Sequence, residues 1–489
     1  MGFYLGFDIG TSSIKATAID REGTIQKTAV VPISMISPKP GYFEIDTSNQ
    51  WLRGFLTALQ SLGTDLVSQA EGICISSVCA SFVPIDTAGY PLRNAIMYGI
   101  DTRATAQIEW LNHTLSGESL SSISGSGFTA HSVIPKIMWL KEHEPDIYER
   151  TYYFVESSNV ITSFLTEEYA WDKPTAAGAH LLDMKTEFYP EALFEKIGIE
   201  ITKFPPLRSP LDILGKVTRR ASKLTGLPIG IDVAVGACDI NAEAFACGAF
   251  DPGSLLIVFG STISTLFTMS EYKAIPGFLI GPSVLQNTYR LGGATSSGGR
   301  YLEWLNRTLE IDDASLVIDV SKPSSLLMVP FLDGARLPYQ DPEYRVFWYG
   351  MTSSTTKSEY WLAAAEAMGC EIYDLISILS KTSQVPPFAY VSGGLSSNPV
   401  FLKIFSNVTG LVLKRFKNNN ASFGDALMAL SLTEGLERTR SILNSKKNGD
   451  TVEITEPDMS LFRSYEEKRK LYTLAVKWIK AIGVSNDRP

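Results

Sequence analysis

A short strand–turn–strand pattern occurs twice in this chain, once at its start and once past its middle. In the first copy, the apolar residues 3–9 lead into Gly10-Thr11-Ser12-Ser13, and a second apolar stretch follows. In the second copy, the apolar residues 255–259 lead into Gly260-Ser261-Thr262 in the same way. Glycine lets the backbone turn sharply, and the N–H and hydroxyl groups that follow can donate hydrogen bonds to an oxyanion. The pattern therefore predicts two hairpins whose turns bind phosphate groups.

A glycine–hydroxyl turn between two strands is more often an ordinary hairpin turn without a ligand. Two observations favour phosphate binding here. The carboxylate of Asp8 directly precedes the first turn, and the whole pattern is duplicated. A phosphate chain held by two such turns would be bound from both sides.

The size and composition of the chain are those of an ordinary globular protein. With 489 residues, 45% hydrophobic and 19% charged, it is too long for a single core and suggests roughly two to four domains. The longest aliphatic runs fall far short of the roughly 20 residues that cross a bilayer. Because no secretory leader is recognisable either, we expect a cytoplasmic protein with no membrane partner. A net charge of −9 also disfavours a nucleic-acid partner.

The cysteines and histidines limit the possible chemistry. Five cysteines contain no C-x-x-C pair, so we expect reduced, mostly buried thiols and no zinc or disulfide architecture. Four histidines are scattered along the chain, which favours neither a metal cage nor a histidine relay. Acid–base chemistry is therefore expected mainly from carboxylates.

Strand-like and helix-like segments alternate throughout, as in α/β proteins. The break at residues 245–253 predicts a boundary between domains 1–247 and 248–489. Trp51, Phe55 and Leu59 predict an amphipathic helix over residues 48–61. A capping box at Thr356 predicts a long helix that ends near Ser380, and the Ser/Gly-rich residues 119–127 predict a loop.

A lone carboxylate, Asp239, follows a predicted strand that ends at Gly236 and precedes a helix of small residues. Asp is a common helix N-cap, and for Asp239 in isolation an N-cap role has about the same weight as a catalytic role. The position of Asp239 just upstream of the second turn favours a general base.

Further on, a strand runs into Gly393-Gly394 and then a helix. Paired glycines allow a flat ring such as adenine to lie on the backbone, and a helix N-terminus favours negative charge.

Together these segments resemble the FGGY carbohydrate kinases, a family of the actin/hexokinase/Hsp70 ATPase superfamily. The similarity covers about residues 3–435, and its motifs occur in order along the chain at residues 8–15, 135–145, 236–239, 260–262, 330–350, 392–399 and 423–426. The resemblance implies an α/β fold of two actin-like ATPase (ribonuclease H-like) domains that flank an interdomain active-site cleft. It also implies that domain 1–247 binds the sugar and that domain 248–489 holds the adenosine pocket.

The resemblance assigns roles to individual residues. Asp239 would be the catalytic base, and Asp8 and Asp239 would hold Mg²⁺. The phosphates of ATP would contact Gly10, Thr11, Ser12, Ser13, Lys15, Gly260, Ser261 and Thr262. The adenosine would contact Gly393, Gly394 and Asn398.

The sugar contacts are the part of the resemblance in which this chain departs most. Cys79-Ala80 stands where xylulose kinases carry a Met-His pair that touches the sugar, and Cys79 could equally be a small core residue. Asp101 lies in a segment similar to the family's Trp-Asn-Asp-x-Arg and would accept hydrogen bonds from sugar hydroxyls.

We expect ATP-dependent phosphorylation of a ketopentose such as xylulose. Kinases of gluconate, ribulose, erythritol or glycerol share the phosphate motifs and stay open as alternatives. From other classes, a nucleotide-driven chaperone or filament ATPase and a catalytically silent sugar sensor also stay open. Dimers are common in the family, so a homodimer is a further expectation.

Overall fold

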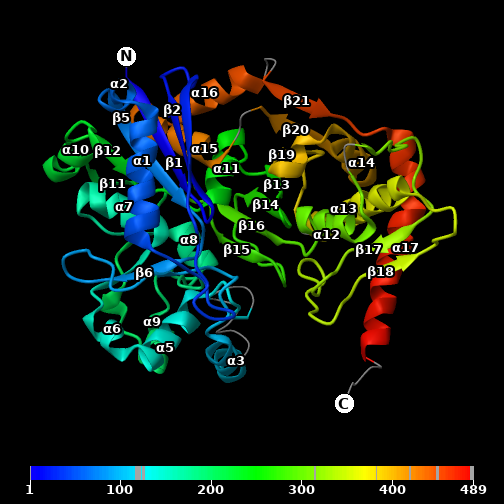
Figure 1. Cartoon of the computed structure of the whole chain (residues 1–489), viewed down its shortest axis with the longest axis horizontal. Helices are drawn as coiled ribbons and strands as arrows, with labels where there is room; N and C mark the ends of the chain where they lie inside the picture. Colours follow the sequence, from blue (N-terminus) through cyan, green and yellow to red (C-terminus); the bar gives the residue numbers. More distant parts are fainter. Residues whose placement is uncertain are drawn as a thin grey trace. The chain divides into compact units, whose positions relative to one another are not determined.

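The computed structural model describes residues 2–115, 123, 127–312, 315–381, 383–417, 420–447 and 451–484 (Figure 1). Its contacts divide the chain into two compact units, each built from segments far apart in sequence. Unit 1 contains residues 1–251, 270–290 and 419–447, and unit 2 contains residues 252–269, 291–418 and 448–489. The contiguous domains 1–247 and 248–489 stay a prediction, because the units are defined by contacts and are interleaved along the chain.

Unit 1 is organised around a six-stranded sheet in the order β11-β12-β5-β1-β2-β3. β1 pairs antiparallel with β2 and parallel with β5, and β5 pairs parallel with β12. The register places Asp8 of β1 opposite Lys15 of β2 and Ser76 of β5. The strands of this sheet are β1 (Phe3–Ile9), β2 (Ser13–Ile19), β3 (Ile25–Pro32), β5 (Ala70–Ser77), β11 (Ile213–Lys216) and β12 (Asp232–Ala234).

Unit 1 also contains smaller sheets and most of the helices. A four-stranded sheet has the order β4-β7-β6-β8, and β9 pairs with β10. These and the remaining strand of the unit are β4 (Glu44–Ile45), β6 (Phe82–Ile85), β7 (Ala95–Ile96), β8 (Tyr153–Glu156), β9 (Trp171–Asp172), β10 (Leu207–Arg208) and β15 (Leu279–Pro282). The helices are α1 (Arg53–Leu62), α2 (Thr64–Val67), α3 (Thr105–Thr114), α5 (Val133–His143), α6 (Pro145–Arg150), α7 (Ser157–Thr166), α8 (Lys173–Gly178), α9 (Glu191–Ile197), α10 (Arg219–Thr225), α11 (Asp239–Cys247), α15 (Ala421–Glu434) and α16 (Leu436–Lys447).

Unit 2 repeats the topology of the first sheet. In its sheet, the strands β16-β14-β13-β19-β20-β21 lie next to one another in this order. β13 pairs antiparallel with β14 and parallel with β19, and β19 pairs parallel with β20. β11 at one end of the first sheet is antiparallel to β12, and β21 at the corresponding end of the second sheet is antiparallel to β20. The repeat seen in the sequence is therefore a repeat of the fold, with a glycine turn at the same place in each sheet.

The elements of unit 2 are the following. The strands are β13 (Leu255–Phe259), β14 (Ile263–Met269), β16 (Tyr289–Ala294), β17 (Leu327–Val329), β18 (Phe347–Tyr349), β19 (Phe388–Ser392), β20 (Val412–Phe416) and β21 (Val452–Thr455). The helices are α12 (Gly299–Leu309), α13 (Lys357–Ser380), α14 (Pro399–Thr409) and α17 (Met459–Val484). The capping box at Thr356 is present, and α13 ends at Ser380 as predicted.

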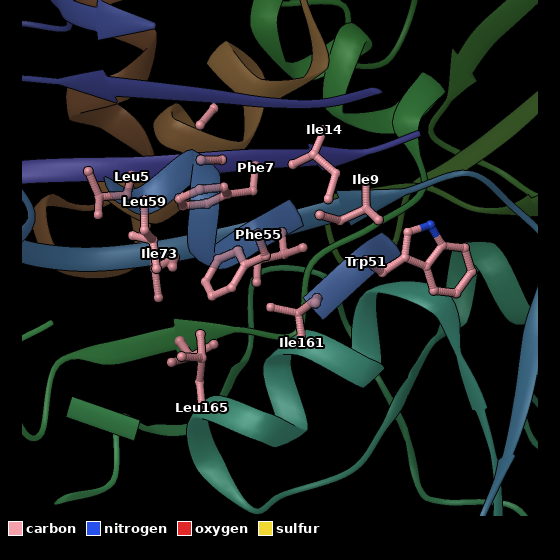
Figure 2. Packing of buried hydrophobic residues seen from close by; sticks show 14 of the residues in the cluster. Leu5, Phe7, Ile9, Ile14, Trp51, Phe55, Leu59, Ile73, Ile161 and Leu165 are labelled. Atoms are coloured by element: carbon pink, nitrogen blue, oxygen red, sulfur yellow. The ribbon is translucent and has the colours of Figure 1, made fainter. Parts of the chain in front are cut away.

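The core of unit 1 forms where apolar side chains of β1 and α1 pack together (Figure 2). Phe7 and Phe55 meet edge to face, with ring centroids 4.8 Å apart. Trp51, Phe55 and Leu59 are all buried, as their helical spacing predicts. The first turn of the predicted helix, Thr47–Leu52, is π-helical, and α1 itself begins at Arg53. The predicted loop at residues 119–127 lies largely outside the described residues.

Helix α15 packs in unit 1 although it follows most of unit 2 in sequence. Glycine permits this approach at two places. A Cβ on Gly6 of β1 would lie 2.1 Å from the backbone oxygen of Ser422. A Cβ on Gly424 of α15 would lie 1.9 Å from the backbone oxygen of Ala242 in α11. Backbone therefore contacts backbone at both positions, and a side chain would force the elements apart.

Candidate active site

The first predicted phosphate turn is a tight hairpin between β1 and β2. The Gly10 N–H donates to the Ser13 carbonyl at 3.1 Å. A Cβ on Gly10 would lie 2.8 Å from that same oxygen, so glycine is required for the turn. Thr11, Ser12 and Ser13 keep partial or full solvent access. The turn thus presents its polar groups, as the sequence predicts.

Asp8 lies at the end of β1, immediately before this turn, and is almost completely buried. Lys15 Nζ is 3.5 Å from its Oδ2 atom. Burial raises the pKa of Asp8, and the charge of Lys15 opposes that rise. A buried carboxylate of this kind gains from a nearby cation.

The second predicted phosphate turn joins β13 to β14 in unit 2. The Gly260 N–H donates to the Thr262 carbonyl at 3.1 Å, so this turn is one residue shorter than the first, in which Gly10 bonds to Ser13. The start of α12 supports it, since the N–H groups of Gly299 and Arg300 donate to the carbonyls of Gly260 and Ser261 at 2.9 and 3.1 Å. Both hairpins therefore begin their turn with a glycine whose N–H closes it, although the turns differ in length by one residue.

Asp239 is the first residue of α11, and Cys238 occupies the N-cap position. The preceding glycine, Gly236, has φ +85° and lies against the backbone oxygen of Ile75, where a Cβ would be 2.1 Å away. This close approach directs the chain from β12 into α11. Asp239 Oδ1 accepts a hydrogen bond from the Ile240 N–H at 2.7 Å, and the residue is half-buried.

The electrostatic surroundings of Asp239 are unusual for a helix N-terminus. Burial, then the charge of Cys238 and then the charge of the Asp8 carboxylate raise the pKa of Asp239 well above its usual value. Asp8 therefore lies close enough to influence Asp239. Two such carboxylates supply the hard oxygen ligands that Mg²⁺ prefers, and a dication would relieve their repulsion. The donor set fits the predicted magnesium ion.

The predicted sugar contacts fall into two separate clusters. Ligand atoms of Cys79, Cys238 and Asp239 lie within 4.8 Å of one another. Ala80 is buried beside Cys79. Cys79 therefore lies close to Asp239, and contact of Cys79 and Ala80 with a sugar stays a prediction.

Asp101 belongs to the other cluster and is fully buried. It accepts hydrogen bonds from Arg103 Nη2 at 2.8 Å and from the Phe43 N–H at 2.7 Å. Arg103 in turn lies over the rings of Tyr42 and Trp139, 4.5 and 5.0 Å from their centroids. These contacts give Asp101 a structural role, and its contact with a sugar stays a prediction.

The predicted adenosine segment lies at the end of β19 in unit 2. Gly393 has φ +86°, and a Cβ there would lie 2.5 Å from the Phe259 carbonyl, directly before the second turn. Within the described part of the chain, Gly394 faces open space. Asn398 Oδ1 caps α14 by accepting from the Val400 and Phe401 N–H groups, each at 3.0 Å. The segment is therefore next to the second turn, with room above Gly394.

Comparison with known proteins agrees with this geometry. Residues 3–246 match the N-terminal domain, and residues 255–432 the C-terminal domain, of the FGGY family of carbohydrate kinases. The chain belongs to the FGGY family. The predicted resemblance and the actin-like two-domain fold class are thereby confirmed.

Individual FGGY relatives extend the similarity over nearly the whole chain. A xylulose kinase of Staphylococcus xylosus is 25% identical over 440 residues, which cover 88% of this chain and 90% of the relative. A probable L-xylulose kinase of Haemophilus influenzae is 28% identical over 502 residues, which cover 99% of each. Among solved structures, a xylulose kinase from Rhodospirillum rubrum has a TM-score of 0.87 at 24% identity and covers 98% of this chain and 99% of its own. A Plasmodium falciparum glycerol kinase with ADP has a TM-score of 0.86 at 20% identity and covers 100% and 99%.

Sequence reasoning missed one cavity of this FGGY kinase. It lies in unit 2, measures about 650 Å³ and reaches the second turn at Ser261. Its other lining residues are Arg300, Glu303, Trp304, Arg307, Leu332 and Asp333. One sequence signal could have indicated α12 as a lining helix. Three charged residues follow a Gly-Gly pair at the helical spacing i, i+3 and i+7, namely Arg300, Glu303 and Arg307.

Sequence reasoning placed residues 423–426 in a family motif but gave no role to Asp425, a buried carboxylate of α15 in this FGGY kinase. Its Oδ2 accepts a hydrogen bond from Ser76 Oγ at 2.6 Å. Burial raises the pKa of Asp425 well above its usual value, and the charge of Asp8 adds to the rise. Asp425 is therefore a second buried carboxyl group within electrostatic reach of Asp8. Among the described residues, no helix combines the length and apolar character needed to span a membrane.

Proposed function

We propose that this chain transfers the γ-phosphate of ATP to a hydroxyl group of a ketopentose such as xylulose. The observation that carries the proposal is the half-buried carboxylate of Asp239, placed at the start of α11 within electrostatic reach of Asp8. Family membership supports a carbohydrate as acceptor. Relatives named xylulose kinase, which match most of the chain, support the ketopentose.

In the proposed reaction, Asp239 accepts the proton of the sugar hydroxyl as that oxygen attacks the γ-phosphorus. A carboxylate whose pKa is raised by burial is a stronger base than a free aspartate. Its hydrogen bond from the Ile240 N–H fixes one oxygen and leaves the other for the substrate. Asp239 therefore combines basicity with a fixed orientation.

Asp8 and Asp239 would hold Mg²⁺, which neutralises charge on the phosphate oxygens when it is bound. Lys15, next to Asp8, adds a further positive charge to the first turn. The backbone N–H and hydroxyl groups of residues 10–13 and of residues 260–262 would bind phosphate oxygens. In this type of transfer the protein acts mainly by positioning the reactants and by electrostatic stabilisation.

We assign the adenosine part of ATP to unit 2. The cavity beside Ser261 gives a nucleotide room to extend from the second turn, and Gly394 offers open backbone nearby. Asn398 can contribute only its amide N–H groups, because its oxygen already caps α14. Gly393, Gly394 and Asn398 keep the adenosine role predicted from the sequence.

An ADP-release assay with purified full-length protein, ATP and Mg²⁺ tests this function. The acceptors are D-xylulose, L-xylulose, D-ribulose, erythritol, glycerol and gluconate, each compared with a control without sugar. We expect the highest kcat/KM with one of the xyluloses. A higher value with gluconate, ribulose, erythritol or glycerol would assign the chain to that alternative substrate.

The same assay separates the other classes of function. ATP hydrolysis that does not depend on any sugar would favour a chaperone or filament ATPase. Sugar binding without ADP release would indicate a silent sensor. The cytoplasmic location and the homodimer also stay proposals. None of the five cysteines, all of them described, forms a disulfide, which supports a reducing compartment.

A further inference from the structure

Two cysteines far apart in the sequence meet beside the proposed catalytic base. Cys79 follows β5, and Cys238 is the N-cap of α11. The chain brings them together because Ser77 forms a parallel bridge with Cys238, just beyond the paired strands β5 and β12. The two Sγ atoms and a carboxylate oxygen of Asp239 all lie within 4.8 Å of one another.

The spacing and the types of these atoms suit a soft divalent cation. In a tetrahedral zinc site, Zn–S bonds of about 2.3 Å and Zn–O bonds of about 2.0–2.2 Å place ligand atoms roughly 3.5–3.8 Å apart. The three atoms need only small shifts to reach that geometry. We propose that Cys79, Cys238 and Asp239 form a binding site for Zn²⁺ or a similar thiophilic dication, with the fourth position open to water.

The nearby positive charge balances the charge of the bound site. Arg290 Nη1 lies 3.5 Å from the Cys238 Sγ atom and is held there by Asn241 Oδ1 at 3.1 Å. Its Nη2 donates to the Pro174 carbonyl at 2.7 Å. Two thiolates and one carboxylate carry three negative charges, and the dication with the Arg290 guanidinium carries three positive charges. The three ligands, the dication and Arg290 together therefore carry no net charge.

Binding at this site has a direct chemical consequence. Each cysteine binds the metal as its thiolate, so any proton that a thiol still carries is released to solvent as the ion binds. The Asp239 carboxylate then coordinates the ion and is no longer free to accept a substrate proton. Thiophilic cations should inhibit the kinase even in the presence of excess Mg²⁺, because Mg²⁺ competes only for Asp239 and not for the two thiolates. The site itself does not depend on the proposed function, whereas the inhibition does.

Co²⁺ titration of the full-length protein tests the site without sugar or nucleotide. We expect one equivalent of Co²⁺ to produce the near-ultraviolet charge-transfer absorption of a cobalt–thiolate bond. Cys79→Ser and Cys238→Ser should each lower the affinity roughly 100-fold or more, because they remove a direct ligand. Cys247→Ala is the matched control, since Cys247 is a buried thiol of the same helix α11. Thermal unfolding checks that each variant is folded.

A second measurement uses the wild-type protein alone. Zn²⁺ should protect Cys79, which is half-buried, from alkylation, as counted by mass spectrometry of its peptide. The site would be overturned if Co²⁺ did not bind, or if it bound without thiolate absorption. It would also be overturned if the absorption survived both serine variants, or if Zn²⁺ left the alkylation of Cys79 unchanged. If the site binds metal and the chain has no kinase activity, the proposed function fails and the metal site stands.

Discussion

At the scale of single residues, the chemistry depends on how burial changes the properties of carboxyl groups. Asp8, Asp239 and Asp425 are all placed where burial raises their pKa values, and the charge of Asp8 contributes to the rise in the other two. The sequence alone could single out Asp8 and Asp239, because Asp8 directly precedes a glycine turn and Asp239 lies between a strand that ends at a glycine and a helix. It could not single out Asp425, because nothing in its local sequence shows that α15 reaches unit 1.

Asp239→Asn tests the proposed base directly. The amide has the same shape and can still accept from the Ile240 N–H, but it cannot take up the substrate proton. We expect turnover to fall roughly 10²- to 10⁴-fold, with little change in ATP binding. Steady-state ADP release and calorimetric titration of ATP measure the two quantities. Asp232→Asn, on the preceding strand β12 and half-exposed, is the control. Normal turnover of Asp239→Asn would mean that another group is the base.

Glu371 of α13 supports the second turn from within unit 2. It accepts a hydrogen bond from Ser297 Oγ, and the Ser297 carbonyl accepts from the Ile263 N–H at 2.8 Å. Burial raises the pKa of Glu371 to about 8, although the hydrogen bond from Ser297 opposes the rise. The folded protein therefore keeps a proton on Glu371 that the unfolded chain loses above its usual pKa of 4.5.

This difference predicts how stability depends on pH. Between the two pKa values the folded state binds more protons, so the free energy of unfolding should fall as pH rises, by up to about 1.4 kcal/mol per pH unit. Glu371→Gln mimics the protonated acid and should remove this part of the dependence. Denaturant unfolding at pH 5.5, 6.5 and 7.5 compares the two proteins. Glu467→Gln, an exposed glutamate of α17, should behave like the wild type. Equal slopes for Glu371→Gln and the wild type would exclude a raised pKa.

At the scale of elements, local patterns predicted helices and turns well where the determining contacts are close in sequence. The capping box at Thr356 and the apolar spacing of Trp51, Phe55 and Leu59 are such cases. The contact between α11 and α15 is different, because it joins residues that are distant in sequence. A glycine such as Gly424 in a helix indicates close packing in general, but it does not name the partner.

Gly424→Ala tests this contact. The added methyl group would lie 1.9 Å from the backbone oxygen of Ala242, so α15 must move away from α11. We expect a loss of about 3 kcal/mol in the free energy of unfolding, at the upper end of the usual effect of overpacking. Gly394→Ala is the control, because a Cβ on Gly394 would have no heavy atom of the other described residues within 4 Å. Denaturant midpoints of the two variants should differ clearly. Equal stability would show that the helices do not approach so closely.

At the scale of the whole molecule, the two repeated sheets are distributed over interleaved segments of one chain. Unit 1 is completed only by residues 419–447, which include α15 and α16. These helices cover apolar residues of the amino-terminal part, including Tyr4 and Phe245, in one shared core. Buried hydrogen bonds also join the two parts, between Thr17 and Ser422 at 2.8 Å and between Ser76 and Asp425.

This arrangement predicts that the amino-terminal part cannot fold alone. A fragment of residues 1–251 would expose the apolar surface that α15 and α16 cover, and it would leave Ser76 without its partner. Exposed apolar area of this kind removes stabilisation of about 25 cal/mol per Å². We expect the fragment to lack a cooperative thermal transition and to bind a hydrophobic dye. A fusion of residues 1–251 to 419–447 through a Gly/Ser linker should recover a transition, whereas a fusion to 459–484, a helix of unit 2, should not. Cooperative unfolding of the 1–251 fragment at the temperature of the full chain would show that α15 and α16 are dispensable for unit 1.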